Sequence, residues 1–503
     1  MNRKVTLLYI SLACVLSLQA QTRQQMGGVY YAYPEGPSAK TGTFGTATYV
    51  LSDSLNVPQG YAPFYISHYG RHGSRWMPKD DRYVWICKHF EDESNLTPLG
   101  LQVKGMLQRV WENARGNGGK LSKLGALQHQ GIAHRMFERY PQIFAAGNAV
   151  KARSSVVDRC AKSMQAFTSE LHTLQSGLNL DVKTDSADMA WIAYVSPEMK
   201  ALENRTHVQA QVSPRRFLLQ LFKDVSKVDE PLKLMTEMHT VASSIQDVGL
   251  NFSSYPQDIE DGLNALFTDG EFRAIYEANN LRMAINNGTV ATNEDIPARS
   301  AISLWQNIEA EADRALRSVK LSATLRFGHD TALYRLLSLL FDVNVPPAGA
   351  REEASLVVLG DETEKMDRVV PMAANLQMIF YKNAKDSVLV KFMLNERDIM
   401  LSPVGQVIYG THYYSWNAWK QEMHERIHRL EHIRQLNAIN TMVGTAQANT
   451  QTAGMFGKGS EEHGQTIPAV LVPNGQNFWT PQTGKMGDGW QYVYTANKIR
   501  GFK

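Results

Sequence analysis

The sequence predicts an α/β protein whose middle part is mainly helical. Short apolar runs rich in β-formers occur at 64–66 and again within 369–401, where Val388–Leu394 is nearly continuous and short enough for a buried strand. Segments with apolar residues every three or four positions alternate with these runs. Residues 185–320 show mainly this helical spacing and are interrupted by prolines. These observations predict strands and helices on either side of a helical domain.

The predicted elements follow one another in a definite order. Residues 21–60 are rich in Gly, Pro, Ser, Thr and Tyr and predict an extended lead-in with little helix. A predicted helix from 156 to about 174 follows a strand end, and Ser154 or Ser155 is its expected cap. Residues 441–503 give no definite prediction. The other predicted elements are a strand and turn at 64–75, helices from about 96 to 144, the strand end at 150–155, strands over 369–401 and a charged helix from 416 to about 440.

Length, charge and the first residues restrict the class of protein. The 503 residues exceed one typical domain, so two structural units or one with a large insertion are expected. The net charge is only +3 and no long Lys/Arg block occurs, so nucleic acid is not an expected partner. Residues 1–20 have a charged start, a short apolar run and a final Ala20, which predict a secretory signal peptide. We therefore expect an exported protein, periplasmic or secreted, without a membrane span; lipid anchoring through Cys14 is the weaker alternative.

The segment Tyr65–Arg75 carries the main candidate for an active site. It reads Tyr-Ile-Ser-His-Tyr-Gly-Arg-His-Gly-Ser-Arg and places His72 between Arg71 and Arg75 on a loop with glycines. A guanidinium presents a fork of N–H donors that matches phosphate oxygens two at a time, and a neutral imidazole is a competent nucleophile. The loop therefore predicts a phosphoryl-binding site, with a surface turn rich in Arg and His as the alternative.

Two later segments add residues of the same chemistry. Leu325–Leu333 places adjacent His329 and Asp330 between a predicted strand and an apolar helix. Ala152–Arg159 supplies Arg153 at a junction between a strand and a helix.

Taken in this order, these segments resemble the histidine acid phosphatase family, the two-domain branch of the histidine phosphatases. That family shows Arg-His-Gly-x-Arg near its start, an Arg-Ser/Thr strand end after the first helices, and a His-Asp pair far downstream. The resemblance covers about residues 60–430. The chain departs from the pattern at the exit of the first loop, where Pro78 comes one residue later than the proline of the family.

The resemblance implies a catalytic α/β core, with a central mixed sheet flanked by helices, and an inserted mainly helical domain. We expect the core to comprise residues 21–180 and 320–430 and the helical domain residues 181–319. Residues 431–503 are then a C-terminal extension of unknown role.

The resemblance also implies a role for each motif residue. His72 becomes the nucleophile, His329 a second phosphate contact and Asp330 the proton donor. The phosphate clamps are then Arg71, Arg75 and Arg153. Three guanidiniums can hold the phosphoryl oxygens while the histidine attacks in line and forms a phosphohistidine. A carboxyl beside a dianion has a raised pKa, so an acid to mildly acid optimum is expected, and no metal or other cofactor is needed.

The expected substrate is a small phosphomonoester. Segments at 327–340, 370–375 and 390–396 look similar to the inositol polyphosphate phosphatase branch. That branch commonly carries His-Ala-Glu, whereas this chain has His329-Asp330-Thr331, the form of other phytases and acid phosphatases. We expect a phytase-like enzyme acting on inositol polyphosphates, or a broad acid phosphatase. Lys79 is a candidate contact for an additional phosphate, and a solvated surface lysine is the alternative.

Three other functions compete with this interpretation. His424-Glu425-Arg-Ile-His428 fits the H-E-x-x-H pattern of zinc metallopeptidases, although the surrounding helix is charged on nearly all sides and favours a solvated surface helix. A non-catalytic phosphate-binding module of the same fold is the second alternative. Transfer of the phosphoglycerate mutase type is the third, and the predicted signal peptide disfavours it. Whether Cys87 and Cys160 pair cannot be read from the sequence.

Overall fold

The structure is a computed structural model that describes residues 22–33, 43–44, 47–48, 57–251, 257–288, 293–318, 320–340, 366–399, 413–432 and 435. The predicted signal peptide and the stretch 441–503 lie outside these residues. Of the helices in the described part, none combines the length and the apolar character that a membrane span requires.

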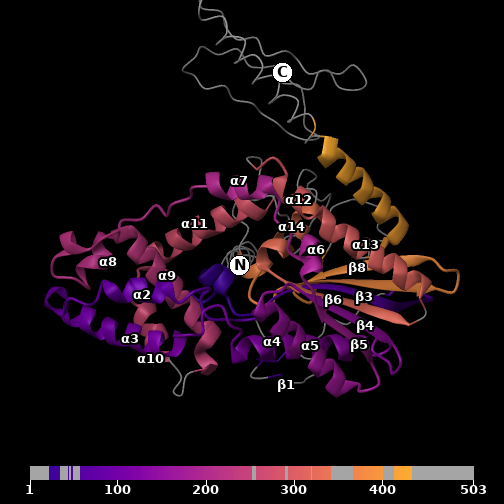
Figure 1. Cartoon of the computed structure of the whole chain (residues 1–503), viewed down its shortest axis with the longest axis horizontal. Helices are drawn as coiled ribbons and strands as arrows, with labels where there is room; N and C mark the ends of the chain where they lie inside the picture. Colours follow the sequence, from indigo (N-terminus) through magenta and orange to yellow (C-terminus); the bar gives the residue numbers. More distant parts are fainter. Residues whose placement is uncertain are drawn as a thin grey trace, which may run out of the picture.

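A mixed sheet is the central feature of the α/β part (Figure 1). Its strands are β3 (Tyr61–Arg71), β4 (Ala149–Ser154), β5 (Asn179–Thr184), β6 (Leu321–Gly328), β7 (Asn375–Asn383), β8 (Val388–Leu394), β9 (Arg397–Ile399) and β10 (Tyr413–Ser415). The order is β10-β8-β7-β3-β6-β4-β5, with β9 paired to β8. The pairs β3–β6, β6–β4 and β4–β5 are parallel, and the remaining pairs are antiparallel. The predicted fold class, a mixed sheet flanked by helices, is confirmed.

Two further strands lie outside this sheet: β1 (Thr43–Phe44) and β2 (Ala47–Thr48) form an antiparallel pair of their own. The apolar run predicted as a buried strand is β8, with the predicted bounds. The strand predicted at 64–66 is part of a longer one, because β3 begins at Tyr61 and extends to Arg71.

Helices cover both faces of the sheet (Figure 1). One face carries α4 (Lys123–Arg139) and α5 (Asp158–Leu174), and the other carries α13 (Ile302–Arg317), α14 (Asp330–Leu340) and a helix over 416–432. Because side chains alternate along a strand, Tyr65 and Tyr69 of β3 join the apolar cluster on the α13 face and Ile66 joins the cluster on the α4 face. The sheet is therefore buried on both sides, as parallel strands require.

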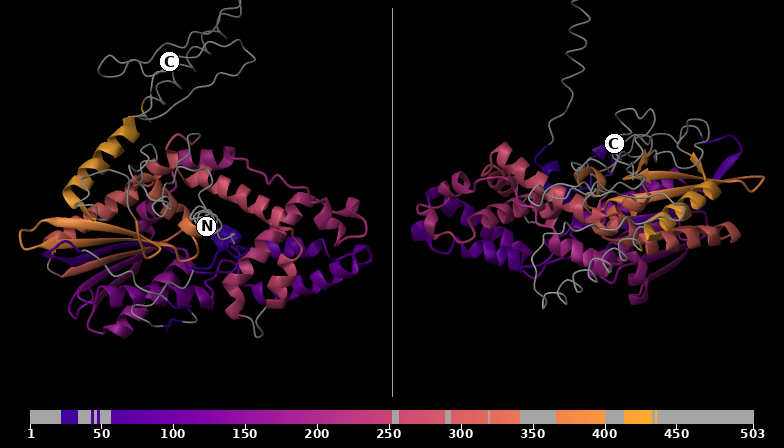
Figure 2. Two further views of the ribbon diagram at one scale, coloured as in Figure 1. Left: turned by 180° about the vertical axis from the view of Figure 1, so that it is seen from behind. Right: turned by 90° about the horizontal axis from the view of Figure 1, so that it is seen from above.

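The chain between β5 and β6 is helical. It forms η3 (Ser186–Asp188), α6 (Met189–Ile192), α7 (Pro197–Arg205), α8 (Arg215–Leu219), η4 (Val225–Lys227), α9 (Pro231–Val248), η5 (Gly249–Asn251), α10 (Gln257–Asn264), α11 (Asp269–Asn287) and α12 (Ile296–Ser300). The remaining helices are η1 (Gln25–Tyr30), α2 (Asp81–Lys88), η2 (Glu93–Asn95), α3 (Pro98–Ala114) and α15 (Met366–Val369). Figure 2 shows the helical part and the sheet as two lobes beside each other.

The packing of α2 and α3 differs from the expected division of the chain. We expected residues 81–114 to belong to the α/β core, but their apolar side chains share one cluster with α8, α9, α10 and α11. Met26 of η1 joins the same cluster. The domain boundaries drawn from the sequence stay a prediction.

Local sequence explains where several helices begin. Thr97 caps α3 by accepting a hydrogen bond from the Gly100 N–H, and proline follows it at the first helical position. Thr268 forms a capping box with Glu271 at the start of α11. For α5 the predicted serine cap is wrong, because Val157 is the N-cap residue and the Ser155 hydroxyl accepts a hydrogen bond from its N–H.

Candidate active site

The candidate site lies where β3, β6 and β4 end. Arg71, the last residue of β3, is opposite Gly328 of β6, and the His72 N–H donates to the Gly328 carbonyl at 2.9 Å. His329 follows directly, so the His72 and His329 rings are 5.8 Å apart and nearly perpendicular. The carboxyl ends of parallel strands are the usual location of ligand sites in α/β proteins. The sheet thus brings together two motifs separated by more than half of the chain.

The loop after β3 packs directly against the start of α4. A Cβ on Gly73 would lie 2.4 Å from the Gly125 carbonyl oxygen, and a Cβ on Gly125 would lie 2.2 Å from the backbone carbonyl oxygen of Ser74. Only glycine fits at both positions, because each Cβ would collide with backbone. The Gly73 N–H donates to Ser163 Oγ and the Ser74 N–H to Gln128 Oε1. Both contacts hold the loop in one conformation.

His72 is in the state required of a nucleophile. Its Nδ1 is 2.9 Å from the Gly73 carbonyl oxygen, which can only accept, so Nδ1 carries the proton and Nε2 carries the lone pair. Burial lowers the pKa of His72 well below 6.5, and the positive charges of Arg71 and Arg75 lower it further. The imidazole is therefore neutral across the physiological pH range.

Arg71 is fully buried, and not all of its N–H donors have a hydrogen-bond acceptor among the described residues. Its Nη1 donates to the Val29 carbonyl at 2.8 Å and to the Val370 carbonyl at 2.6 Å. Its Nη2 is 3.1 Å from Asp330 Oδ2, while Nε has no hydrogen-bond partner among the described residues. Nε of Arg75 is likewise buried without such a partner. Buried cationic donors of this kind indicate a site for an anion.

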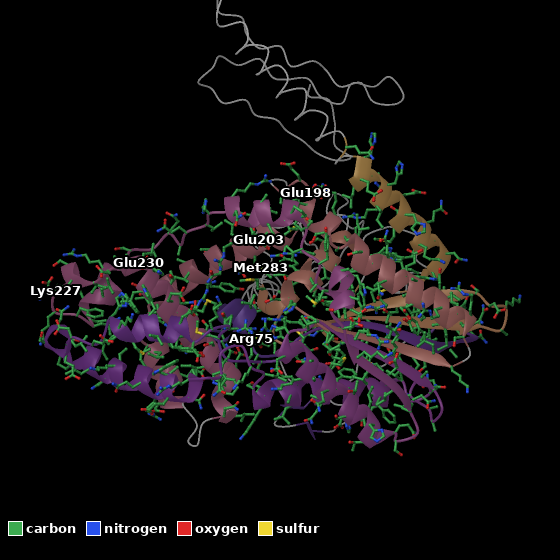
Figure 3. All side chains as sticks on the ribbon, in the orientation of Figure 1. Arg75, Glu198, Glu203, Lys227, Glu230 and Met283 are labelled. Carbon is green, nitrogen blue, oxygen red and sulfur yellow. The ribbon has the colours of Figure 1, made fainter. Side chains whose placement is uncertain are left out.

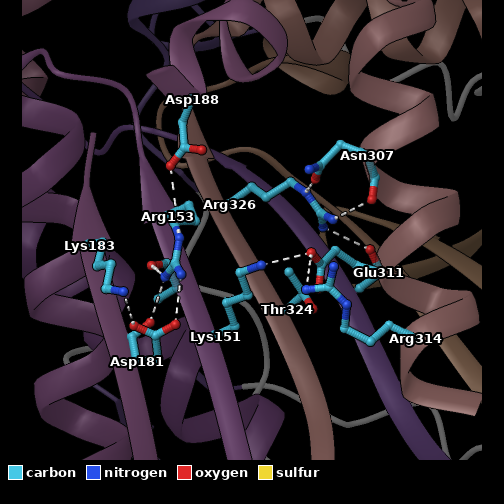
Figure 4. Close-up of polar contacts among 12 residues, drawn as sticks. Lys151, Arg153, Asp181, Lys183, Asp188, Asn307, Glu311, Arg314, Thr324 and Arg326 are labelled. Atoms are coloured by element: carbon cyan, nitrogen blue, oxygen red, sulfur yellow. Dashed lines mark hydrogen bonds and ion pairs between the residues drawn. The ribbon is translucent and has the colours of Figure 1, made fainter. Parts of the chain in front are cut away.

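The guanidinium of Arg153 contacts Asp181 and Asp188 (Figure 4). Arg153 lies opposite Arg326 in the sheet, and its Nη1 and Nη2 donate to the Asp181 carbonyl and carboxylate at 2.8 and 2.6 Å. Its Nε is 3.8 Å from Asp188. Two carboxylates therefore contact the guanidinium for which the family resemblance implied a phosphate partner.

Arg159, in the first turn of α5, lies nearer to the two histidines. Its charge contributes to the lowered pKa of both His72 and His329. Its own pKa is lowered by burial and by the neighbouring Arg75, and its Nε is buried without a hydrogen-bond partner in the described part of the chain. The segment Ala152–Arg159 contains both arginines, and the family resemblance implied the first, because the family pattern has Arg-Ser/Thr at the strand end. Arg159 is the residue that this reasoning missed.

His329 follows the end of β6, and Asp330 is the first residue of α14. The Ser155 hydroxyl and His329 Nε2 are 3.1 Å apart. Burial lowers the pKa of His329 to about 4, so this ring is also neutral near pH 7. Burial raises the pKa of Asp330, but the charges of Arg71 and Arg75 outweigh burial and leave this pKa below its ordinary value. Asp330 is therefore ionised in the structure.

The two cysteines of the described chain are free thiols. Cys160 is buried at the start of α5, and its Sγ donates to the Gly328 carbonyl at 3.2 Å. Burial raises the pKa of Cys160 to about 11, so it is a packing neighbour of His329 rather than a reactive thiolate.

A cavity of about 300 Å³ lies between the helical part and the start of α14, where Asp330 and Thr331 line it. Glu203 and Met283 line it and are labelled with Arg75 in Figure 3. Two cations, Arg82 of α2 and Arg282 of α11, also belong to its wall. The predicted phosphate contact Lys79 is exposed and does not belong to the described lining.

The H-E-x-x-H segment lies on the exposed side of the helix over 416–432. His424 Nε2 is 2.8 Å from Glu309 of α13, and His428 is exposed. The apolar side chains of this helix, Trp416, Trp419, Met423 and Leu430, pack into the core. Within the ranges that the structure describes, no three His, Cys, Asp or Glu side chains are grouped so as to hold a metal ion. The arrangement is that of an ordinary surface helix.

Comparison with known proteins relates the chain to phosphatases. No family model matches it. It is 23% identical over 338 residues to multiple inositol polyphosphate phosphatase 1 of Gallus gallus, covering 64% of this chain and 73% of that protein. The crystal structure of the Bifidobacterium longum multiple inositol polyphosphate phosphatase with inositol hexasulfate aligns with a TM-score of 0.59 at 16% identity, over 79% of this chain and 97% of that one. The phytase from D. castellii aligns with a TM-score of 0.55 at 12% identity, over 80% and 85%.

At these identities the structural matches show a shared fold. The curated relative is itself named a phosphatase, in agreement with the resemblance stated from the order of the motifs.

Proposed function

Because the chain has the fold and motif order of the histidine acid phosphatases, we propose that it hydrolyses phosphomonoesters through a phosphohistidine on His72. Inositol phosphates are the proposed substrate class, since the curated relative and a structural neighbour are inositol polyphosphate phosphatases and another neighbour is a phytase. The proposed enzyme needs no metal ion.

One observation carries this proposal: a neutral His72, whose Nε2 carries the lone pair, lies among buried guanidinium donors that lack acceptors in the described part of the chain. Hydrogen bonds from Arg71, Arg75 and Arg159 to the phosphoryl oxygens would satisfy those donors and neutralise the charge of the transition state. We assign the third clamp to Arg159 instead of Arg153, whose guanidinium is occupied by Asp181.

The proposed reaction has two steps. His72 Nε2 attacks phosphorus, the bond to the leaving oxygen breaks, and that oxygen takes a proton from Asp330. Water then attacks the phosphohistidine, Asp330 accepts its proton, and the bond electrons return to His72. The ion pair with Arg71 keeps Asp330 ionised without substrate. A bound phosphate dianion offsets that charge, so substrate binding would raise the pKa of Asp330 and prepare the acid.

Arg82 and Arg282 are the proposed contacts for further phosphates of the substrate. Both line the cavity that reaches Asp330. Arg82 is 3.5 Å from Glu237 and Arg282 bonds to Asn279, so neither is held by the close, buried carboxylate pairing seen elsewhere in the chain. Arg282→Gln should raise KM for a polyphosphate several-fold more than KM for p-nitrophenyl phosphate.

The decisive experiment compares wild type with His72→Ala on p-nitrophenyl phosphate and inositol hexakisphosphate, with and without EDTA. We expect kcat/KM to fall by at least about 10³-fold in the variant. An alkaline quench of wild type with ³²P-labelled substrate should leave label on the protein, and His72→Ala should not. His172→Ala, an exposed histidine on α5, is the matched control.

Other results would favour the competing functions. Loss of wild-type activity in EDTA would support the zinc alternative. Tight binding of phosphate by a wild type without turnover would support a binding module.

We also propose export through residues 1–20, and N-terminal sequencing of the mature protein should begin at Gln21.

A further inference from the structure

Residues Thr22–Tyr33, here called the strap, cross between the helical part and the α/β part. At one end, Arg23 Nη2 donates to the Phe267 carbonyl at 3.0 Å and to Asp269 at 2.7 Å. At the other end, the Tyr31 carbonyl accepts from the Met372 N–H at 2.8 Å. The Tyr33 hydroxyl adds a 3.0 Å hydrogen bond to Glu396. The strap is therefore tied to both parts of the molecule.

Between these ends the strap turns towards the candidate site. Gly28 has φ +61°, and a Cβ there would lie 3.0 Å from the Met366 side chain, so this turn requires glycine. The turn places the Val29 carbonyl 2.8 Å from Arg71 Nη1. It also places the Tyr30 ring over Arg75, with 5.5 Å between ring centre and Cζ.

The strap is also part of the cavity wall. Residues 26–30 line the same cavity as Asp330 and Thr331. The Tyr30 phenol is close enough to Arg71 and Arg159 to influence the pKa of each guanidinium. One short segment therefore contacts two of the proposed phosphate clamps and lies near the third.

We propose that the strap completes the substrate-binding site and that Tyr30 is a positioning residue that fixes the plane of the Arg75 guanidinium for phosphate. This inference rests on the proposed function. The Arg75 side chain has few other restraints: Nη1 donates to the Trp76 carbonyl at 2.9 Å, and Nε has no partner among the described residues. An aromatic face attracts a guanidinium and limits its rotation, which reduces the entropy lost when phosphate binds.

The test uses the full chain and inorganic phosphate as the probe, with the dissociation constant measured by calorimetry. Tyr30→Leu removes the aromatic face and should weaken phosphate binding and raise KM for p-nitrophenyl phosphate, each by about tenfold. Tyr30→Phe keeps the face and should restore binding to within about threefold of wild type. Tyr194→Leu is the matched control, because Tyr194 is an exposed tyrosine outside both the strap and the described cavity lining.

The outcomes separate this inference from the proposed function. Wild type that neither binds phosphate nor hydrolyses esters contradicts the proposed function. If wild type binds phosphate and hydrolyses esters, and a folded Tyr30→Leu variant binds phosphate equally tightly, then only the proposed role of Tyr30 is overturned. If Tyr30→Leu does not fold, Arg23→Ala decides: releasing the strap end should weaken phosphate binding, and unchanged binding would overturn the inference.

Discussion

The Ser74 hydroxyl donates a 2.6 Å hydrogen bond to the buried carboxyl of Asp247, which joins the loop of His72 to helix α9. Ser74 also accepts from Gln128 Nε2 at 2.9 Å, and the Ser122 hydroxyl donates to the Asp247 backbone carbonyl at 2.6 Å. The proposed nucleophile is thus held from both parts of the molecule. Burial raises the pKa of Asp247 to about 8, although Ser74 and the nearby Arg75 and Arg71 act in the opposite direction.

This raised pKa makes stability depend on pH. Between the ordinary value of 3.8 and about 8, folded protein retains a proton on Asp247 that the unfolded chain releases. The contribution is fully present below about pH 4 and is lost as pH rises to about 8. Asp247→Asn should flatten the fall in unfolding free energy between about pH 5 and pH 8, measured in urea. Asp258 is the control, because its pKa is lowered and it stays ionised over this range, so Asp258→Asn should keep the wild-type slope of unfolding free energy against pH. Equal slopes in all three proteins would contradict the prediction.

Arg159 and Arg153 should differ sharply in their effect on catalysis. Arg159→Gln removes a proposed clamp and should lower kcat/KM for p-nitrophenyl phosphate by about 10²- to 10³-fold. Arg153→Gln breaks contacts with Asp181 and should change the same ratio by less than about fivefold, because that guanidinium faces other residues. If Arg153→Gln lowered kcat/KM more than Arg159→Gln, Arg153 would be the third clamp, as the sequence predicted.

Asp330→Asn should distinguish good from poor leaving groups. An alkyl alcohol needs a proton as it departs, so hydrolysis of an alkyl phosphate should fall by about 10²- to 10⁴-fold. p-Nitrophenolate departs without that help and should be affected far less. Because the active form holds the proton, wild-type kcat should fall as pH rises through the pKa of substrate-bound Asp330, and the variant should lack this dependence. Equal losses on both substrates would argue against Asp330 as the acid.

The buried pair between Arg135 and Glu396 should be important for stability. Arg135 Nε and Nη2 donate to the carboxylate at 2.8 and 2.5 Å, and both side chains are largely shielded from solvent. Glu396→Ala leaves a buried guanidinium without this partner and should cost about 3 to 5 kcal/mol in urea unfolding. Lys382→Ala, which breaks the exposed pair with Asp386, should cost less than about 1 kcal/mol. Similar costs for the two variants would contradict this interpretation.

Part of the candidate site was predictable because its motifs are short and contiguous. The loop around His72 and the His329-Asp330 pair each place residues typical of phosphate chemistry within a few positions. Apolar runs in the sequence indicate β3, β6 and β8. Two strands that end beside each other are enough to bring such motifs together. The role of Arg153 stays a prediction, since sequence cannot say which of two arginines, six positions apart across a strand end and a helix start, faces the loop. Alternation along β4 sends Arg153 to Asp181, whereas the first turn of α5 carries Arg159 towards the histidines.

The sequence by itself therefore determined the class of fold and the proposed nucleophile, because local patterns encode strands, helices and the chemistry of one loop. The proposed acid came from the resemblance of the motifs to a known family. Only the tertiary structure decided the third clamp, the buried Asp247 behind Ser74, and the strap that places Tyr30 over Arg75. Each of these depends on contacts between segments far apart along the chain, and packing between segments determines which side chains meet.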